Sequence, residues 1–241
     1  MKLAEGLHRI GNDLVACHLI ATPDGLTLVD AGLAGHWSAL QRELSLIGAD
    51  PEDITAVILT HGDSDHIGFA ERLRREHGVP VYVHTADAGR ATGGPKPETG
   101  WGRTRPLAVA QFLGYAATHG GLKTEWLTEV TSFEAPVILD VPGRPQVIGL
   151  PGHSPGSVAF EFADVGALFV GDALTTRNAL TGRRGLAPAP FTDEPDQAQQ
   201  ALAALTGLDA QWLIPGHGPV ARDVALAELP ALVAAAAGSL A

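Results

Sequence analysis

Histidine and aspartate residues follow four short apolar runs of this chain, and together these residue types can bind a divalent cation. The runs cover residues 56–60, 146–150, 167–170 and 211–214. They lead into His61-Gly62-Asp63-Ser64-Asp65-His66, Pro151-Gly152-His153, Gly171-Asp172 and Pro215-Gly216-His217. Short apolar runs bounded by glycine and proline indicate buried strands. Because imidazole and carboxylate groups are typical ligands of zinc-like cations, we predict that four strand ends build one metal cluster.

The spacing of His61 and His66 indicates a loop. Five residues correspond to a rotation of about 500° on an α-helix, so the two rings would not share a face. The pattern is therefore not the helical His-Glu-x-x-His arrangement of many zinc enzymes. A loop can turn His61, Asp63, Asp65 and His66 inward together. Each residue alone would be an ordinary polar loop residue, and the prediction depends on the joint pattern, in which each run leads to a candidate ligand with glycine beside it.

Composition narrows the classes of partner. The 241 residues carry a formal net charge of −11 and no basic run of five residues, which argues against nucleic acid as the main partner. Two short basic stretches, 72–75 and 183–184, are expected to be solvated charges, with a local role near an anionic substrate group as the alternative. The single cysteine, Cys17, lies in an apolar stretch and is expected to be a buried hydrophobic residue. No signal-peptide pattern or membrane-length apolar stretch is found, so we predict a cytoplasmic protein without membrane partners.

The periodicity of the remaining chain predicts a mixture of strands and helices. Further strands are expected at 8–10, 13–20, 26–30, 79–83, 137–141 and 157–162, and helices at 36–47, 67–77, 106–118, 197–205 and 224–237, where Pro230 can kink or divide the last helix. Segment 90–135 breaks this rhythm, and we predict a lid-like insertion over the face where the strands end. Its aromatic residues Trp101, Phe112, Tyr115 and Trp126 could line a pocket, although such spacing is more often typical of core. Without a repeat or linker, we predict one domain over 1–241 with a layered architecture.

The four motifs, taken in order, resemble those of the metallo-β-lactamase superfamily. The segment Leu28-Val29-Asp30-Ala31-Gly32 is similar to the N-terminal strand and turn of that family. The resemblance covers almost the whole chain, and segment 90–135 matches least. It implies an α+β fold, a four-layer αββα sandwich, with a two-metal site along one edge of the sheets.

Carried over to this chain, the resemblance implies two sets of metal ligands. His61, Asp63 and His153 would hold the first metal, Asp65, His66 and His217 the second, and Asp172 would bridge them. The family pattern is His-x-His-x-Asp-His, so Asp63 stands where the second histidine is expected. This change adds a negative charge and a hard oxygen ligand, which favours iron or manganese more than an all-histidine site would. Two divalent ions are expected, zinc first, with iron or manganese as alternatives.

The ligand set implies a binuclear metal-dependent hydrolase that attacks a small ester, lactone or amide with a metal-bridging hydroxide. Asp65 is the expected catalytic residue, because it can orient the nucleophile as well as bind metal. Asp30 and Thr60 are expected to orient the ligand loop through hydrogen bonds. Residues 174–177 lack the tyrosine that lactone-cleaving relatives carry after the bridging aspartate, which weakens that assignment.

Two other functions stay open on the sequence. Asp63 resembles the carboxylate ligand of flavo-diiron proteins, so a di-iron redox protein on the same fold is one alternative. A non-catalytic module that binds metal or ligand is the other. A small-molecule substrate is the expected partner, and a homodimer is left open.

Overall fold

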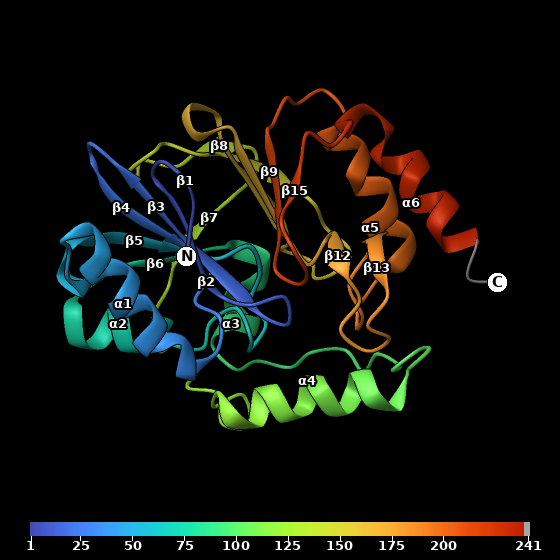
Figure 1. Ribbon diagram of the computed structural model, residues 1–241, viewed down its shortest axis with the longest axis horizontal. Helices are drawn as coiled ribbons and strands as arrows, with labels where there is room; N and C mark the ends of the chain where they lie inside the picture. Colours follow the sequence, from blue (N-terminus) through green and yellow to red (C-terminus); the bar gives the residue numbers. More distant parts are fainter. Residues whose placement is uncertain (239–241) are drawn as a thin grey trace.

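Two β-sheets face each other in the computed structural model, which describes residues 1–238 (Figure 1). Residues 239–241, the end of the predicted domain, lie outside this range. The first sheet has the order β1-β2-β3-β4-β5-β6-β7. Its strands are β1 (Lys2–Ala4), β2 (Leu7–Gly11), β3 (Ala16–Thr22), β4 (Gly25–Val29), β5 (Ile54–Ile58), β6 (Val81–His84) and β7 (Thr131–Phe133). The strands from β1 to β4 pair antiparallel, and those from β4 to β7 pair parallel.

The second sheet has the order β15-β14-β11-β10-β9-β8. Its strands are β8 (Val137–Ile138), β9 (Gln146–Gly149), β10 (Val158–Phe162), β11 (Ala167–Gly171), β14 (Trp212–Pro215) and β15 (Ala221–Arg222). A separate hairpin of β12 (Thr175–Arg177) and β13 (Arg184–Ala187) follows β11. Strands β11 and β14 pair parallel, so their carboxyl ends meet at one edge of the sheet.

Alternation along the strands explains the layers. In β5, Val57 packs into the cluster on the outer face of the first sheet, whereas Ile58 packs into the cluster between the sheets. In β11, Phe169 belongs to the central cluster and Leu168 to the cluster on the outer face of the second sheet. Because successive side chains of a strand point to opposite faces, both sheets bury both of their faces.

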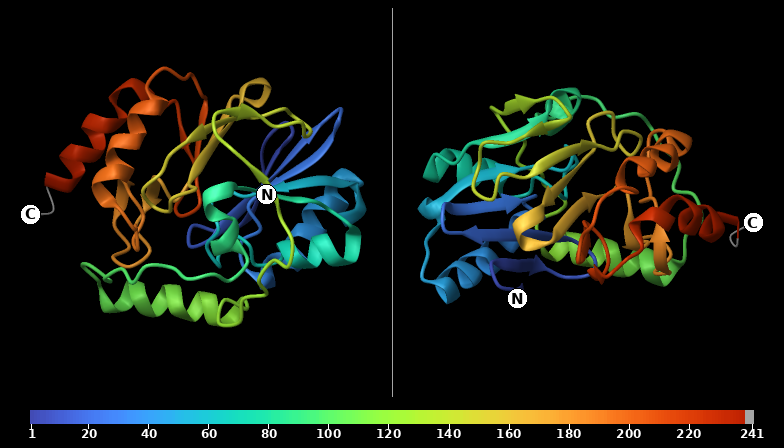
Figure 2. Two further views of the ribbon diagram at one scale, coloured as in Figure 1. Left: turned by 180° about the vertical axis from the view of Figure 1, so that it is seen from behind. Right: turned by 90° about the horizontal axis from the view of Figure 1, so that it is seen from above.

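Helices supply the outer layers (Figures 1 and 2). Helices α1 (Trp37–Ile47) and α2 (Ala70–His77) cover the first sheet, with Leu40 and Leu73 fully buried in its outer cluster. Helices α5 (Pro195–Ala201) and α6 (Leu229–Gly238) cover the second, where Leu229 is fully buried. The predicted four-layer αββα sandwich is confirmed, and Cys17 is a buried core residue as expected.

Segment 90–135 contains the end of α3 (Ala88–Ala91) and the whole of α4 (Pro106–Thr118), the second of which has the predicted bounds. Helix α4 runs along the edge of the molecule beneath both sheets (Figures 1 and 2). The amide of Gly35 donates to the carbonyl of His119 at 2.8 Å, and Arg177 donates to Gln111 at 2.8 Å. The helix therefore contacts elements from both halves of the fold.

The core interpretation of the aromatic residues in this segment is wrong. Trp101 and Trp126 are 52% and 42% exposed, and Phe112 and Tyr115 are only half-buried. For Phe112 and Tyr115 the physical reason is that α4 lies along an edge instead of packing on a sheet face, whereas Trp101 and Trp126 lie in loops on either side of this helix. Phe112 faces the ring of His217, with centroids 6.3 Å apart, and the Tyr115 hydroxyl lies 2.7 Å from His36 Nε2.

Smaller differences concern element boundaries. The predicted strand at 137–141 is only two residues long, and the predicted helix at 197–205 becomes a 3-10 turn from Leu202. Helix α6 begins at Leu229, so Pro230 lies in its first turn, where its missing amide hydrogen costs nothing. Within residues 1–238, no helix has the length and apolar character needed to cross a membrane.

Candidate metal centre

The seven candidate ligands converge at one edge where the two sheets meet. The loop after β5 carries His61, Asp63, Asp65 and His66, so the first sheet supplies four of them. The second sheet supplies the other three from the segments after β9, β11 and β14, namely His153, Asp172 and His217. The structure therefore brings together every residue that the motifs predicted as a ligand. All but Asp63 and Asp65 are buried.

The ligand atoms form three overlapping compact groups, of which one, His61 with His66 and Asp172, connects the other two. In the Asp63 group (His61, Asp63, His153) and the Asp65 group (Asp65, His66, His217), they lie within 4.8 Å of one another. Asp63 Oδ2 lies 3.4 Å from His153 Nε2 and 3.8 Å from His61 Nε2. Asp65 Oδ2 lies 3.4 Å from His217 Nε2. These two groups are the ligand sets that the resemblance implied.

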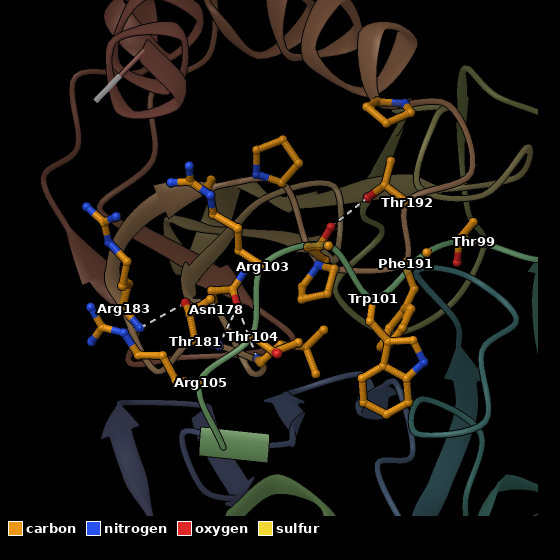
Figure 3. Close-up of a pocket in the computed structure, with 18 of the residues that line it drawn as sticks. Thr99, Trp101, Arg103, Thr104, Arg105, Asn178, Thr181, Arg183, Phe191 and Thr192 are labelled. Atoms are coloured by element: carbon orange, nitrogen blue, oxygen red, sulfur yellow. Dashed lines mark hydrogen bonds between the residues drawn. The ribbon is translucent and has the colours of Figure 1, made fainter. Parts of the chain in front are cut away.

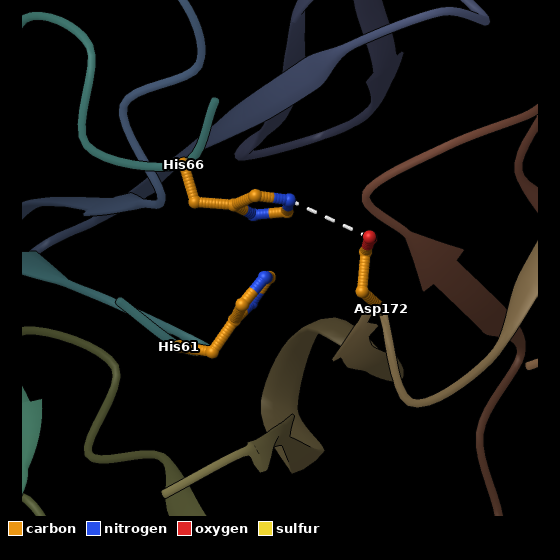
Figure 4. A group of neighbouring side chains, drawn as sticks. All are labelled: His61, His66 and Asp172. Carbon is orange, nitrogen blue, oxygen red and sulfur yellow. Dashed lines mark ion pairs between the residues drawn. The ribbon is translucent and has the colours of Figure 1, made fainter. Parts of the chain in front are cut away.

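Asp172 lies between the two groups. Its Oδ2 is 3.1 Å from His217 Nε2 and 3.8 Å from His153 Nε2, and its Oδ1 is 3.5 Å from His66 Nε2 (Figure 4). One carboxylate thus faces a histidine of the Asp63 group and two of the Asp65 group, as a bridging ligand would. Gly216, directly after β14, leaves no room for a side chain beside Asp172, because a Cβ at this position would lie only 2.7 Å from Asp172 Oδ1.

Unpaired buried atoms test whether the cluster fits a cation. Within residues 1–238, four buried atoms of the cluster have no hydrogen-bond partner: His61 Nε2, His66 Nε2, His153 Nε2 and Asp172 Oδ1. A buried polar atom without a partner costs about 1–3 kcal/mol, so natural proteins rarely keep several together. Cations at this position would satisfy all four. Imidazole nitrogen and carboxylate oxygen are ligands that suit zinc, iron and manganese.

The opposite side of each ring is held by a defined partner. Asp30 Oδ2 lies 2.9 Å from His66 Nδ1 and accepts a bond from the Thr60 hydroxyl at 2.9 Å. The same hydroxyl lies 3.0 Å from His61 Nδ1. Asp30 and Thr60 therefore occupy the supporting positions predicted for them. Such contacts fix the ring orientation and leave Nε2 free for a cation.

Two further partners were not predicted. Thr192 Oγ1 lies 3.1 Å from His153 Nδ1, and the Leu14 carbonyl contacts His217 Nδ1. Neither residue belongs to a motif, and both approach from segments distant in sequence. No sequence signal identifies them, because a threonine or a backbone carbonyl in a loop is ordinary.

Asp87 connects the two loops that carry His61 and His153. Its Oδ2 accepts from the Gly62 amide at 2.8 Å and from the Ser154 hydroxyl at 2.7 Å, and its Oδ1 accepts from the Gly156 amide at 2.7 Å. The residue is fully buried. It was also missed from sequence, since it follows β6 and lies outside the four motifs.

Asp63 is a candidate ligand whose two carboxylate oxygens already have strong partners. Arg90 forms a bidentate ion pair with Asp63, in which Nε contacts Oδ1 and Nη2 lies 3.1 Å from Oδ2. Lys96 Nζ lies 2.6 Å from the same Oδ2. Arg90 also binds Asp193 at 2.7 Å. Burial alone would raise the pKa of Asp63, yet the histidines and cations around it hold that pKa well below its ordinary value. The carboxylate is therefore ionised and ready to bind, but it shares its oxygens with two side-chain cations.

Charges within the cluster also act on the histidines. Burial opposes protonation of His217, yet the Asp172 carboxylate raises the pKa of His217 to about 9. Burial likewise opposes protonation of His66, but Asp30 and Asp172 raise its pKa well above the ordinary value. Cations that take these nitrogens must displace protons, so cation binding should weaken as the pH falls.

A cavity of 990 Å³ adjoins the cluster (Figure 3). We call it the hairpin cavity, because residues 99–105, the turn and the β13 strand of the β12–β13 hairpin, and residues 188–192 with Pro195 line it. Its wall residue Thr192 contacts His153, and the amide of Ala189, also in the wall, donates to the carbonyl of Asp172 at 3.2 Å. Residues of the cavity wall thus contact two of the candidate ligands directly.

Comparisons with known proteins agree with this arrangement. The model of the metallo-beta-lactamase superfamily matches residues 10–217. The probable metallo-hydrolase YflN of Bacillus subtilis is 27% identical over 228 residues, which cover 90% of this chain and 85% of YflN. These matches support a hydrolase at the level of the superfamily.

Solved structures show the same fold. The family protein TTHA1429 from Thermus thermophilus has a TM-score of 0.68 at 22% identity, covering 99% of this chain and 83% of its own. TTHA1623, solved in a di-iron-bound form, has a TM-score of 0.62 at 29% identity, covering 93% of this chain and 96% of its own. The fold, the four motifs and the family model together show that this chain belongs to the metallo-beta-lactamase superfamily.

Proposed function

We propose that this protein is a hydrolase that uses two divalent cations to cleave a small ester, lactone or amide. The observation that carries the proposal is the pair of three-residue ligand groups with Asp172 between them. The buried nitrogens of His61, His66 and His153 add support, since none of these Nε2 atoms has a hydrogen-bond partner among the described residues.

The two groups would divide the work of binding. The Asp63 group would hold one cation and the Asp65 group the other, and Asp172 would be shared between them. When bound, such a pair supplies Lewis acidity, which acidifies water and withdraws charge from the oxygen of the scissile carbonyl. Zinc suits this set, with iron or manganese as alternatives because of the three carboxylates.

Asp65 would orient the attacking water. It is the most exposed of the seven ligands, with 22% of its side chain accessible, so its second oxygen can accept a hydrogen bond from water at the mouth of the site. Asp30 and Thr60 would keep His66 and His61 turned toward the cations. The hairpin cavity would hold the substrate, and Thr192 in its wall would keep His153 aligned.

The test combines elemental analysis with a substrate panel. Protein purified without added metal should contain close to two divalent ions per chain and hydrolyse members of a panel of activated esters, lactones, thioesters and amides. Asp65→Ala should lower kcat by at least about 100-fold, the lower range for loss of a proton-transfer or orienting group. Asp164→Asn, on an exposed turn after β10, is the matched control and should leave kcat unchanged. Undiminished turnover in Asp65→Ala would refute the proposal.

A di-iron redox protein is the second candidate. The Asp63 carboxylate favours iron more than a histidine would, and the relative TTHA1623 was solved in a di-iron-bound form. Anaerobic purification decides between the two. Iron at about two per chain with reduction of O₂ or NO would support the redox function, whereas bound zinc with ester turnover would reject it.

A further inference from the structure

The hairpin cavity concentrates positive charge in an acidic protein. The chain carries a net charge of −11, yet Arg103, Arg105, Arg183 and Arg184 all line this cavity. Among its described lining residues there is neither aspartate nor glutamate. Guanidinium groups bind carboxylate and phosphate in a bidentate geometry, so the presence of four arginines around one cavity indicates an anionic ligand.

Backbone contacts hold two of these arginines close to the same turn. The amide of Arg105 donates to the carbonyl of Leu180 at 2.9 Å, and the amide of Asn178 donates to the carbonyl of Arg183 at 2.9 Å. Neither the Arg105 nor the Arg183 guanidinium forms an ion pair with any residue in 1–238. Both side chains are exposed, so their donors are available to a ligand.

The two ends of the cavity differ in chemistry (Figure 3). Thr192 lies at one end, where it contacts the candidate ligand His153. Trp101 and Phe191 lie near it and pack edge to face, with centroids 5.4 Å apart, which gives an apolar wall. Arg105 and Arg183 lie toward the other end. The cavity volume of 990 Å³ is at the upper limit of typical small-molecule sites, so one elongated ligand can reach both ends.

We propose that the hairpin cavity selects substrates that carry a carboxylate or phosphate group remote from the scissile bond, held by Arg105 and Arg183. The carbonyl under attack would lie at the Thr192 end, and an apolar spacer would cross Trp101 and Phe191. The inference rests on the proposed hydrolase function and narrows its substrate class to organic anions.

The first test uses two esters that differ in one charge. Mono-4-nitrophenyl adipate carries a carboxylate at the far end of the acyl chain, and 4-nitrophenyl hexanoate has the same length without it. The metal-loaded protein should show a kcat/KM about tenfold higher for the adipate ester, after the rate without protein is subtracted. The double variant Arg105→Gln/Arg183→Gln should lose this preference and keep its rate with the hexanoate ester within about twofold.

Two control variants separate specific binding from general charge effects. The double variant Arg105→Lys/Arg183→Lys keeps both charges but loses the bidentate geometry, so it should retain only part of the preference. Arg42→Gln removes one exposed charge from α1 and should change neither rate. A preference that survives in the double glutamine variant would overturn the inference.

Direct binding provides a readout that does not need turnover. Titration calorimetry with adipate and with butyl phosphate on the metal-loaded protein should show binding of at least one anion, and the tighter anion identifies carboxylate or phosphate as the preferred group. The affinity should fall about tenfold in the double glutamine variant. Binding that is unchanged in this variant would locate the anion elsewhere and refute the inference.

The two proposals can fail separately. If neither ester is hydrolysed but anion binding depends on Arg105 and Arg183, the hydrolase proposal fails and the anion site stands. If both esters are hydrolysed at equal rates and neither anion binds through these arginines, the inference fails and the hydrolase function stands.

Discussion

Replacing Asp63 by asparagine should destabilise the metal-free protein strongly. The Asp63 side chain is 14% exposed and that of Arg90 is 7% exposed, so their ion pair is largely shielded from water. Asparagine keeps the shape of aspartate but removes the charge and one acceptor. The guanidinium of Arg90 would then remain buried with only Asp193 as a charged partner.

The magnitude follows from the contacts that are lost. Arg90 binds both oxygens of Asp63, and each such charge-assisted hydrogen bond contributes about 1.5–3 kcal/mol. Lys96 is one-third exposed and adds less than about 1 kcal/mol. Removing one partner of a buried ion pair lowers the free energy of unfolding by about 3–5 kcal/mol. Because Arg90 keeps its contact with Asp193, we expect a loss at the lower end of this range. We expect a loss of about 3 kcal/mol, equal to a fall in Tm of about 6–12 °C for a chain of this size.

A double-mutant cycle measures the interaction itself. Asp63→Asn, Arg90→Gln and the combined variant are dialysed against a chelator and unfolded in urea, with Tm measured in parallel. The coupling free energy should exceed about 1.5 kcal/mol, because the two residues are in direct contact. Asp140→Asn is the matched control, since its ion pair with Arg144 is exposed on both sides and should change stability by less than about 0.5 kcal/mol.

Two results would refute this reasoning. A coupling free energy below about 0.5 kcal/mol would show that Asp63 and Arg90 do not stabilise each other. A Tm of Asp63→Asn equal to that of the unchanged protein would show that solvent or other residues fully compensate the lost carboxylate.

Two further predictions concern residues outside the ligand set. Asp87→Asn keeps the shape of the side chain that connects the loops of His61 and His153 but weakens three hydrogen bonds. We expect the free energy of unfolding in urea to fall by about 2–4 kcal/mol and zinc to bind more weakly in titration. If both quantities are unchanged, Asp87 does not connect the two loops. Hydrogen bonds from Arg74, followed by Thr128, lower the pKa of Glu71 from 4.5 to about 2, so the unfolded chain takes up this proton at higher pH than the folded protein does. The stabilisation by ionised Glu71 is complete above about pH 5 and is lost toward about pH 2. Glu71→Gln should therefore lower the free energy of unfolding by about 2–3 kcal/mol near pH 7 and by progressively less in acid. A loss that is independent of pH would show that the lowered pKa of Glu71 is not its cause.

The convergence of the candidate ligands could be predicted from sequence because their positions depend on strand ends. His61, His153, Asp172 and His217 each follow a short apolar run, and four such runs in two stacked sheets can meet at one edge. The helix at 106–118 could be predicted equally well, since Pro106 marks its first turn and the segment contains good helix formers. Local rules sufficed in both cases.

The supporting contacts could not be predicted because they depend on tertiary structure alone. Asp87, Arg90 and Thr192 lie in segments without motif or periodicity, and their contacts span 25 to 103 residues of chain. The β12–β13 hairpin has strands of three and four residues with no alternating pattern, so the hairpin was missed, although the sequence indicated Trp101 as a possible pocket residue. The misplacement of Phe112 and Tyr115 has the same origin, because periodicity cannot distinguish a helix on a sheet face from one along an edge.

Asp63 and Arg90 form a matched pair, and the geometry explains why. A carboxylate has two oxygens, so it can accept both prongs of a guanidinium while Oδ2 also faces His153 at 3.4 Å. A histidine at position 63 would offer no second acceptor and would leave Arg90 buried beside a neutral or positive ring. Arg90 therefore needs a carboxylate at position 63 for this contact, and it also binds Asp193, the neighbour of Thr192. Through this chain of contacts the substituted ligand is connected to the wall of the hairpin cavity, which contains Thr192.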